Sequence, residues 1–260
     1  MNIIKRTSDY ILKMIEHKRW NLKLKKYPEL KRVYSVFEKH PQSNWIIGKN
    51  DALNLYKLVL ETKPKKVLEL GTGIGAGTAV IALALKHLGG GVIISIEQSP
   101  KCVEIAQELI EPSLKQRIQI VTAKPVIFKI EKLSKWRYFS GYDWIPEGDF
   151  FNFVVIDGPG RWMQNGELIT LDNGDLIRIL PYLAEGCKVY IDGRRATVEI
   201  IKRYLSTYFT ILEDNDKYTL LYYKKGNKRI KSLNDLQVVD RMLERSSEYL
   251  ENNVVINTNK

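Results

Sequence analysis

The feature that most constrains the fold is a short apolar segment that runs directly into closely spaced glycines. Residues 66–70 have the composition of a buried strand, Gly71, Gly73 and Gly75 follow, and residues 76–88 are rich in Ala, Ile and Leu, as in a buried helix. Glycine permits a tight turn and a close approach of the backbone to a ligand. A strand that passes through such a turn into a helix is typical of doubly wound α/β proteins, which bind ligands at the carboxyl ends of their strands.

The alternation of strand and helix continues along the chain. The expected strands are residues 66–70, 91–96, 117–122, 151–156, 187–191, 210–213 and 218–223, and the helices between them are 76–88, 100–110, 175–183 and 196–208. Apolar strands that alternate with helices predict a parallel sheet covered on both faces. No helix separates the last two strands, so they predict an antiparallel hairpin. The sequence thus indicates a doubly wound, mostly parallel, seven-stranded sheet with an antiparallel edge hairpin.

Segments whose apolar residues have helical spacing also flank this region. The additional helices are expected at residues 3–20, 29–39, 51–62 and 233–250. We therefore expect three regions: a basic N-terminal helical segment (1–44), the α/β domain (45–225) and a C-terminal helical extension (226–260).

The formal net charge of +11 is concentrated near the N-terminus. Residues 1–40 hold 11 Lys and Arg against 4 Asp and Glu, which gives +7, and the other residues hold 30 against 26, which gives +4. Such a segment favours nucleic acid or an anionic surface. A solvated lysine-rich helix face explains the same pattern.

Several classes of protein are not indicated. No apolar run approaches the roughly 20 residues that cross a bilayer, and the first residues lack the pattern of a secretory signal. Cys102 and Cys187 have no metal-binding or redox spacing, so we expect reduced core cysteines and a cytoplasmic protein.

Glu69 discriminates between two cofactors that a glycine-rich loop can hold. Gly71, Gly73 and Ala76 also satisfy the dinucleotide fingerprint. A carboxylate two residues before the loop repels a pyrophosphate but attracts an ammonium or a sulfonium group. The sequence therefore favours a cationic ligand of the methionine type.

Glu97 adds a second constraint at the end of the second strand. It follows Gly71 by 26 residues, where a carboxylate can accept hydrogen bonds from both hydroxyls of a ribose. Either glutamate alone is compatible with an ordinary acid at a strand end, but the two around one glycine loop indicate a nucleoside site.

These segments resemble a known family. Val67-Leu-Glu-Leu-Gly-Thr-Gly-Ile-Gly-Ala-Gly-Thr78 is similar to motif I of the Rossmann-like (class I) S-adenosylmethionine-dependent methyltransferases, and Val92-Ile-Ile-Ser-Ile-Glu-Gln-Ser-Pro100 to their ribose-binding motif. Gly48-Lys-Asn-Asp-Ala52 and Val154-Val-Ile-Asp157 extend the likeness to small-molecule O-methyltransferases of the catechol O-methyltransferase type. The resemblance implies that the cofactor is S-adenosylmethionine.

The resemblance also implies which residues contact the cofactor. The expected contacts are Glu69, Gly71, Thr72, Gly73 and Gly75 at the methionine part, Glu97 and Gln98 at the ribose, Ala123 and Lys124 beside the adenine, and Asp157 near the methyl group. Many methyltransferases have an acidic residue after the third strand, and this sequence has none there.

Asp157 is the expected catalytic residue. Methyl transfer to a hydroxyl requires alignment of the acceptor and removal of its proton, and Asp157 ends the fourth strand beside the expected methyl group. In the similar catechol-type enzymes this position binds Mg²⁺ together with an Asp-Asn pair. Here Asp192 is present and Gly193 replaces the asparagine, so Asp157 and Asp192 are the expected ligands of a possible Mg²⁺. An ordinary turn at Asp157-Gly158 explains the same residues.

No motif in the sequence identifies the methyl acceptor. Residues 160–173, which include Arg161, Trp162 and Met163, form a long connection beside the site, as loops that shape substrate pockets do. Arg194 and Arg195 are candidates for an anionic acceptor or are solvated residues at a helix start. His40 is the histidine expected nearest the pocket.

The leading hypothesis is O-methylation of a small molecule. The alternatives are methylation of RNA, which the basic segment suggests, and a cofactor-binding module without enzymatic activity. A homodimer is a further possibility, and no stable membrane insertion is expected.

Overall fold

A computed structural model describes residues 20, 22, 24–130, 138–148, 150–169 and 171–224. The expected helix at 3–20, apart from Trp20, the helix at 233–250 and the extension at 226–260 lie outside these residues.

The helices and strands follow one another much as expected. The helical elements are η1 (Leu24–Lys26), α2 (Pro28–Glu38), η2 (Ser43–Trp45), α3 (Lys49–Thr62), α4 (Ala76–His87), α5 (Pro100–Leu109), α6 (Pro112–Lys115), α7 (Asp175–Ile179), η3 (Leu180–Tyr182) and α8 (Arg195–Tyr204). The strands are β1 (Lys66–Leu70), β2 (Val92–Glu97), β3 (Ile118–Thr122), β4 (Pro125–Lys129), β5 (Tyr138–Tyr142), β6 (Phe151–Ile156), β7 (Trp162–Gln164), β8 (Glu167–Ile169), β9 (Leu183–Asp192), β10 (Phe209–Asp214) and β11 (Tyr218–Tyr223).

The main sheet confirms the predicted architecture. Its seven strands have the order β10-β11-β9-β6-β1-β2-β3. Strands β3, β2, β1, β6 and β9 run parallel, and β11 is antiparallel to both β9 and β10, which is the expected edge hairpin. The strand order reverses at β1, which has β2 on one side and β6 on the other. The ligand site of a doubly wound sheet is expected at such a switch point.

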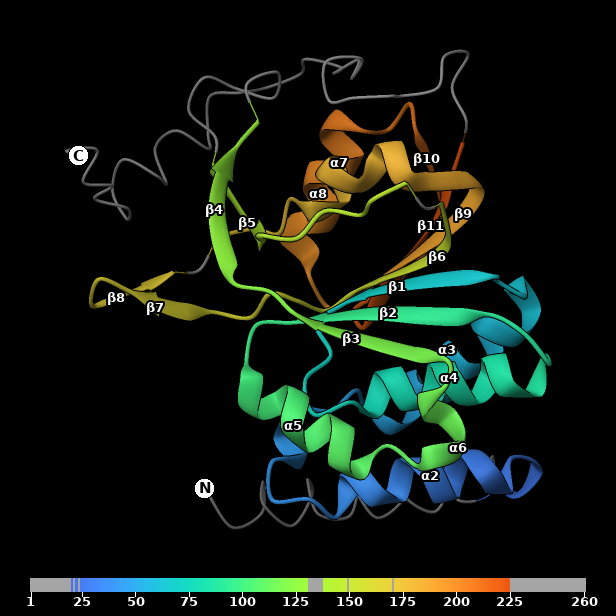
Figure 1. Ribbon diagram of the computed structural model, residues 1–260. Helices are drawn as coiled ribbons and strands as arrows, with labels where there is room; N and C mark the ends of the chain where they lie inside the picture. Colours follow the sequence, from blue (N-terminus) through green and yellow to red (C-terminus); the bar gives the residue numbers. More distant parts are fainter. Residues whose placement is uncertain are drawn as a thin grey trace, which may run out of the picture.

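Helices cover both faces of the sheet (Figure 1). Helices α2 to α6 lie on one face and α7 and α8 on the other. Helix α4 is buried from Ala76 to Leu85 except at Gly77, because α3 and α2 cover the side that faces away from the sheet. Val67 and Leu68 point into different cores, one on each face. No helix among the described residues has both the length and the apolar character needed to cross a membrane.

Two elements differ from the expected boundaries, and the first difference has a local cause. The helix expected at residues 175–183 ends at Ile179 and continues only as the short η3, which contains Pro181. Proline lacks the N–H that an α-helix requires and disfavours its continuation. Strand β9 is longer than expected, from Leu183 to Asp192.

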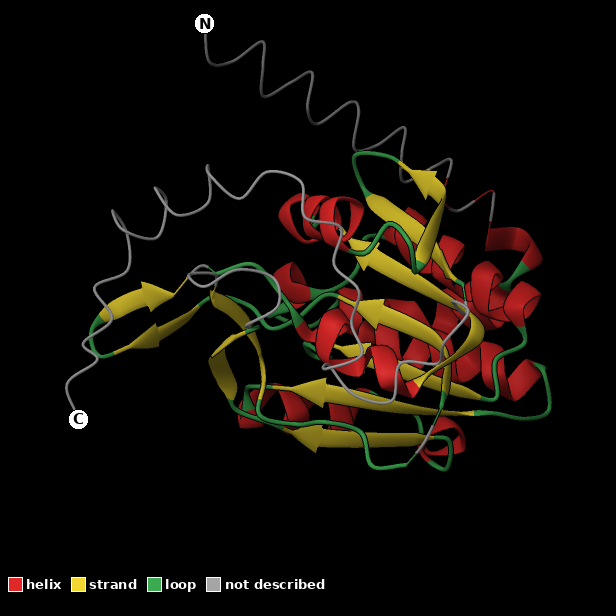
Figure 2. Cartoon of the chain, turned by 90° about the horizontal axis from the view of Figure 1, so that it is seen from above, coloured by secondary structure: helices red, strands yellow, loops and turns green. Residues whose placement is uncertain are grey.

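Two antiparallel hairpins, β4–β5 and β7–β8, were not predicted as strands. They follow β3 and β6 and lie at the end of the sheet where these strands finish (Figure 1). Seen from above, β7–β8 projects from the body of the protein (Figure 2). Its turn is Asn165-Gly166, both with positive φ (52° and 83°), which is the hairpin signal that was overlooked in the sequence.

Candidate functional site

The glycine loop after β1 lies in direct contact with the turn after β6. Gly71 has φ +103°, and a Cβ atom there would lie 2.6 Å from the backbone nitrogen of Gly158. The amide of Asp157 also donates to the carbonyl of Leu70, at 2.7 Å. Only glycine permits this approach, so the loop that was predicted to bind the cofactor and the residue predicted to be catalytic belong to one site.

The amides of the glycine loop are engaged within the protein. Gly71 and Thr72 donate to the carbonyl of Ile96 (2.9 and 3.2 Å), Gly73 donates to the Glu97 carboxylate (2.8 Å), and Gly75 donates to the carbonyl of Thr72 (3.0 Å). A dinucleotide loop offers such N–H groups to a pyrophosphate. These four amides therefore do not form a phosphate cradle.

Glu69 lies beneath the loop. Its side chain is almost fully buried (2% exposed), and its Oε2 accepts hydrogen bonds from Thr78 at 2.5 Å and from Ser95 at 2.6 Å. Burial raises the pKa of Glu69 to about 8, although both hydroxyl groups oppose this rise. These hydrogen bonds hold the Glu69 carboxyl group beneath the loop.

Glu97 joins the loop to the segment after β2. Its Oε2 accepts from Gly73 at 2.8 Å and its Oε1 from Ser99 at 2.9 Å. Burial raises the pKa of this carboxyl group, and the surrounding backbone amides oppose the rise. A carboxylate has about four lone-pair sites, so Glu97 keeps acceptor capacity. Beside it, Gln98 has a buried Oε1 with no hydrogen-bond partner among the described residues.

Asp143 supplies an acidic group where the sequence after β3 lacks one. The amide of Lys124 donates to Asp143 Oδ1 at 2.7 Å, and the amide of Asp143 donates to the carbonyl of Lys124 at 2.9 Å. Ala123 is buried beside this pair, and its amide donates to the carbonyl of Glu97. Sequence reasoning missed Asp143 because the β4–β5 hairpin that returns it to the end of β3 was not predicted.

Asp157 is accessible at the end of β6, with 45% of its side chain exposed. The packed surroundings raise its pKa to about 7, and the negative charges of Asp192 and Glu97 contribute. Arg194 opposes this rise, because its guanidinium lies 3.8 Å from the carboxylate and donates to the backbone carbonyl of Asp157. A carboxyl group with a pKa near neutrality is suited to accept a proton.

The donor set fits a magnesium ion poorly. The pKa of Asp192 is raised to about 6 by burial and by Asp51, and Arg194 opposes this rise too. The Arg194 guanidinium therefore already supplies positive charge to both expected metal ligands, Asp157 and Asp192, where Mg²⁺ would otherwise supply it. Within the described ranges, no group of three His, Cys, Asp or Glu side chains is arranged to hold a metal ion.

A cavity of about 320 Å³ opens beside Asp157. Arg161, Arg194 and Arg195 line it, as do Pro159 and Ile169. Of the other residues of the long connection, Trp162 and Met163 lie on the projecting strand β7. His40 lies in the turn after α2, where its Nδ1 accepts from the amide of Gln42.

One family model matches part of the chain. Residues 20–126 match the family model of protein-L-isoaspartate(D-aspartate) O-methyltransferases. The match covers less than half of the chain and ends before β6. No curated protein sequence matches the chain.

Solved structures show the fold over a longer region. A protein described as an O-methyltransferase from Klebsiella pneumoniae is 19% identical, with a TM-score of 0.55 over 80% of this chain and 99% of that chain. An S-adenosylhomocysteine-bound methyltransferase from Podospora anserina is 14% identical (TM-score 0.51, 75% and 88% covered). A methyltransferase from Geobacter sulfurreducens is 16% identical (0.51, 74% and 90%). The chain has the Rossmann-like fold of class I methyltransferases, as the sequence motifs predicted.

Proposed function

We propose that this chain is an S-adenosylmethionine-dependent methyltransferase that methylates an oxygen atom of a small molecule. The observation that carries the proposal is the group of carboxyl groups at the carboxyl ends of the central strands. These are Glu69, Glu97, Asp157 and Asp192, on β1, β2, the turn after β6 and β9. Burial raises the pKa of Glu69, Asp157 and Asp192, and the repulsion of negative neighbours adds to each rise. A cationic ligand relieves this repulsion, whereas a pyrophosphate adds to it.

The loop and its neighbours would hold the donor. Gly71, Thr72, Gly73 and Gly75 would face its methionine part, Glu97 and Gln98 its ribose, and Ala123 and Asp143 its adenine. The unpartnered Oε1 of Gln98 and the remaining lone pairs of Glu97 fit hydroxyl donors. Glu69 would also lie at the methionine part, held beneath the loop by its hydrogen bonds to Thr78 and Ser95. When bound, S-adenosylmethionine supplies a methyl group on a positively charged sulfur.

Asp157 would accept the proton of the acceptor hydroxyl. Its carboxylate is exposed, lies beside Gly71 and has a pKa near neutrality. An acceptor hydroxyl held at this carboxylate gives up its proton to Oδ while its oxygen is aligned for attack. Arg194 would keep a fraction of Asp157 ionised by lowering its pKa.

The size of the cavity favours a small acceptor. About 320 Å³ lies at the lower end of the range for small-molecule sites. The matching family model names a protein acceptor, but the match ends at residue 126, before Asp157 and every residue of the cavity. The RNA alternative depends on the basic N-terminal segment, of which residues 1–19 lie outside the described part.

The test is transfer of a labelled methyl group from S-adenosylmethionine to a panel of small hydroxyl compounds. We expect label in at least one acceptor, lost in Asp157→Asn and retained in the matched control Asp216→Asn, which alters an exposed residue between β10 and β11. Binding of the donor without transfer to any member of a broad panel would instead favour a cofactor-binding module.

A further inference from the structure

We propose that the acceptor carries an anionic group, such as a carboxylate or a phosphate, which binds in the cavity at Arg161 and the start of α8. A separate hydroxyl of the same molecule would then face Asp157. This inference rests on the proposed function and specifies the class of its acceptor.

The cavity lies between two segments that follow the central strands. One wall is the turn after β6, with Pro159, Gly160 and Arg161. The opposite wall is the first turn of α8, with Ala196 and Thr197. Asp157 does not itself line the cavity, but Arg194 does, and its guanidinium lies 3.8 Å from the Asp157 carboxylate.

Arg194 connects the cavity to Asp157. Its Nη1 donates to the carbonyl of Pro159 at 3.1 Å, and its Nη2 donates to the carbonyl of Asp157. Its Nε is buried and has no acceptor among the described residues. Because this Nε is buried, Arg194 would act on a bound anion through the positive charge of its guanidinium.

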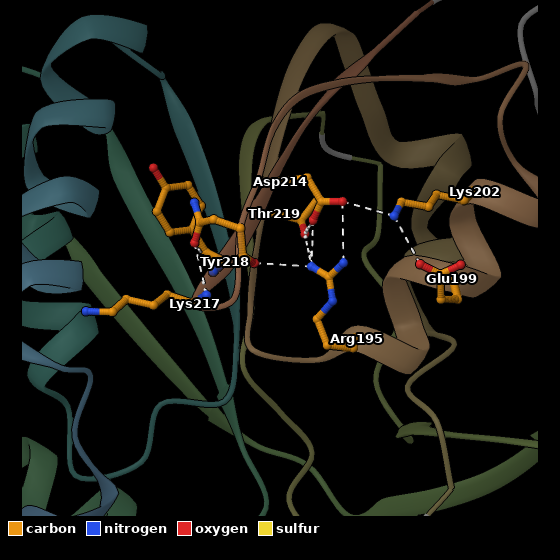
Figure 3. Close-up of polar contacts among 8 residues, drawn as sticks. Arg195, Glu199, Lys202, Asp214, Lys217, Tyr218 and Thr219 are labelled. Atoms are coloured by element: carbon orange, nitrogen blue, oxygen red, sulfur yellow. Dashed lines mark hydrogen bonds and ion pairs between the residues drawn. The ribbon is translucent and has the colours of Figure 1, made fainter.

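The charge of the lining is mainly positive. Three arginines and one acidic residue, Asp172, belong to it. Arg195 is engaged elsewhere, because it binds Asp214 at 2.5 Å, and Asp214 also binds Lys202 at 2.9 Å (Figure 3). Arg161 is exposed, and none of the described residues forms an ion pair with it. Arg161 and Arg194 are therefore the arginines that face a bound anion.

The start of α8 adds to the positive potential of the cavity. This helix has ten residues, no side chain caps its N-terminus, and its first turn contains no acidic residue. The unpaired amides of a helix N-terminus favour an anion. The start of helix α8 and the two arginines thus all favour the binding of an anion.

The anionic group is the anchor of the acceptor and not the atom that is methylated. Burial and the negative charges of Asp192 and Glu97 raise the pKa of Asp157, so a second anion at that position would be repelled. A hydroxyl has a proton to donate there. Pro159, Ile169 and Leu171 form an apolar part of the lining, which fits a molecule with an apolar body between a hydroxyl and an anionic end.

The test compares two probes of the same shape, meta-hydroxybenzoate and the neutral meta-hydroxybenzamide. Each is titrated calorimetrically into the full chain saturated with S-adenosylhomocysteine, whose own binding is measured first. We expect the acid to bind about tenfold more tightly than the amide, as one charge-assisted hydrogen bond provides. Inorganic phosphate, against chloride at equal ionic strength, should displace the acid and not the amide.

Two variants separate a local effect from net charge. Arg161→Gln should bring the acid and the amide to nearly equal affinity. Arg203→Gln, which removes the same charge at the far end of α8, should leave the preference intact. Equal binding of both probes, binding of neither, or a preference that survives Arg161→Gln would overturn the inference. Absence of S-adenosylhomocysteine binding would overturn the proposed function instead.

Discussion

The amide of Gly73 donates a hydrogen bond of 2.8 Å to the carboxylate of Glu97. This bond joins the glycine loop after β1 to the end of β2 through the side chain that we propose binds the ribose. The same bond occupies an amide that a dinucleotide would need for its phosphates. The contact therefore bears directly on which cofactor the site accepts.

Replacement of Glu97 by Ala should weaken the binding of S-adenosylhomocysteine by about 1–3 kcal/mol, because hydrogen bonds to a charged group are lost. Isothermal titration calorimetry measures the change. Glu104→Ala, at an exposed position of α5, should bind as the wild type does. Unchanged affinity in Glu97→Ala would show that Glu97 does not contact the cofactor.

Replacement of Gly71 by Ala should destabilise the protein by about 1–3 kcal/mol or more, because it combines an unfavourable φ with a clash. The added Cβ would lie 2.6 Å from the nitrogen of Gly158. Gly89→Ala is the control: Gly89 also has positive φ (+74°), but nothing lies within 4 Å of its Cβ position. Urea denaturation should show a clearly smaller loss for Gly89→Ala, and equal losses would mean that the contact between the two turns is unimportant.

Glu69 should make the stability of the ligand-free protein depend on pH. Its folded pKa of about 8 lies above the ordinary value of 4.5. The protonated Glu69 therefore contributes fully to the free energy of unfolding below about pH 4.5, and this contribution is lost as the pH rises through about 8. Glu69→Gln keeps the hydrogen bonds without the charge, so it should gain stability relative to the wild type by up to about 1.4 kcal/mol per pH unit in this window.

Urea denaturation between pH 5 and pH 9 measures this difference at each pH. Glu61→Gln, which makes the same change at an exposed position of α3, should run parallel to the wild type. A constant difference between Glu69→Gln and the wild type would contradict the raised pKa.

Methyl transfer should rise with pH through about 7, because Asp157 accepts a proton only when it is ionised. Asp157→Asn should lose activity by about 10²- to 10⁴-fold. Arg194→Gln should move the midpoint of kcat/KM to higher pH, since the guanidinium lowers the pKa of Asp157. Lys101→Gln on α5 should leave the midpoint in place, and a profile that Arg194→Gln does not shift would contradict the assignment.

The sequence predicts the sheet well because its central strands are largely apolar and alternate with helices. Residues 66–70 and 151–156 were expected as strands and are β1 and β6 with the same bounds. The β4–β5 hairpin was missed, since Pro125 begins β4 and Gly141 lies within β5. Both residue types are unfavourable within a strand, and they conceal the pattern that brings Asp143 to the end of β3.

The positions of site residues were easier to predict than the directions of their side chains. Glu69, Glu97 and Asp157 lie at the carboxyl ends of the central strands, as expected. The register pairs Glu69 with Ser95 of β2, and this pairing directs its carboxyl group to a hydroxyl beneath the loop. No local pattern specifies which neighbour a strand residue will meet. The engagement of Arg195 by Asp214 is likewise a tertiary contact between α8 and β10.

The central claim is that the site holds a methyl donor and not a dinucleotide. Calorimetric titration of the full chain with S-adenosylhomocysteine and, separately, with NAD⁺ and NADH tests it most directly. We predict saturable binding of S-adenosylhomocysteine and no binding of either dinucleotide. Tight binding of NAD⁺ or NADH without binding of S-adenosylhomocysteine would contradict the account.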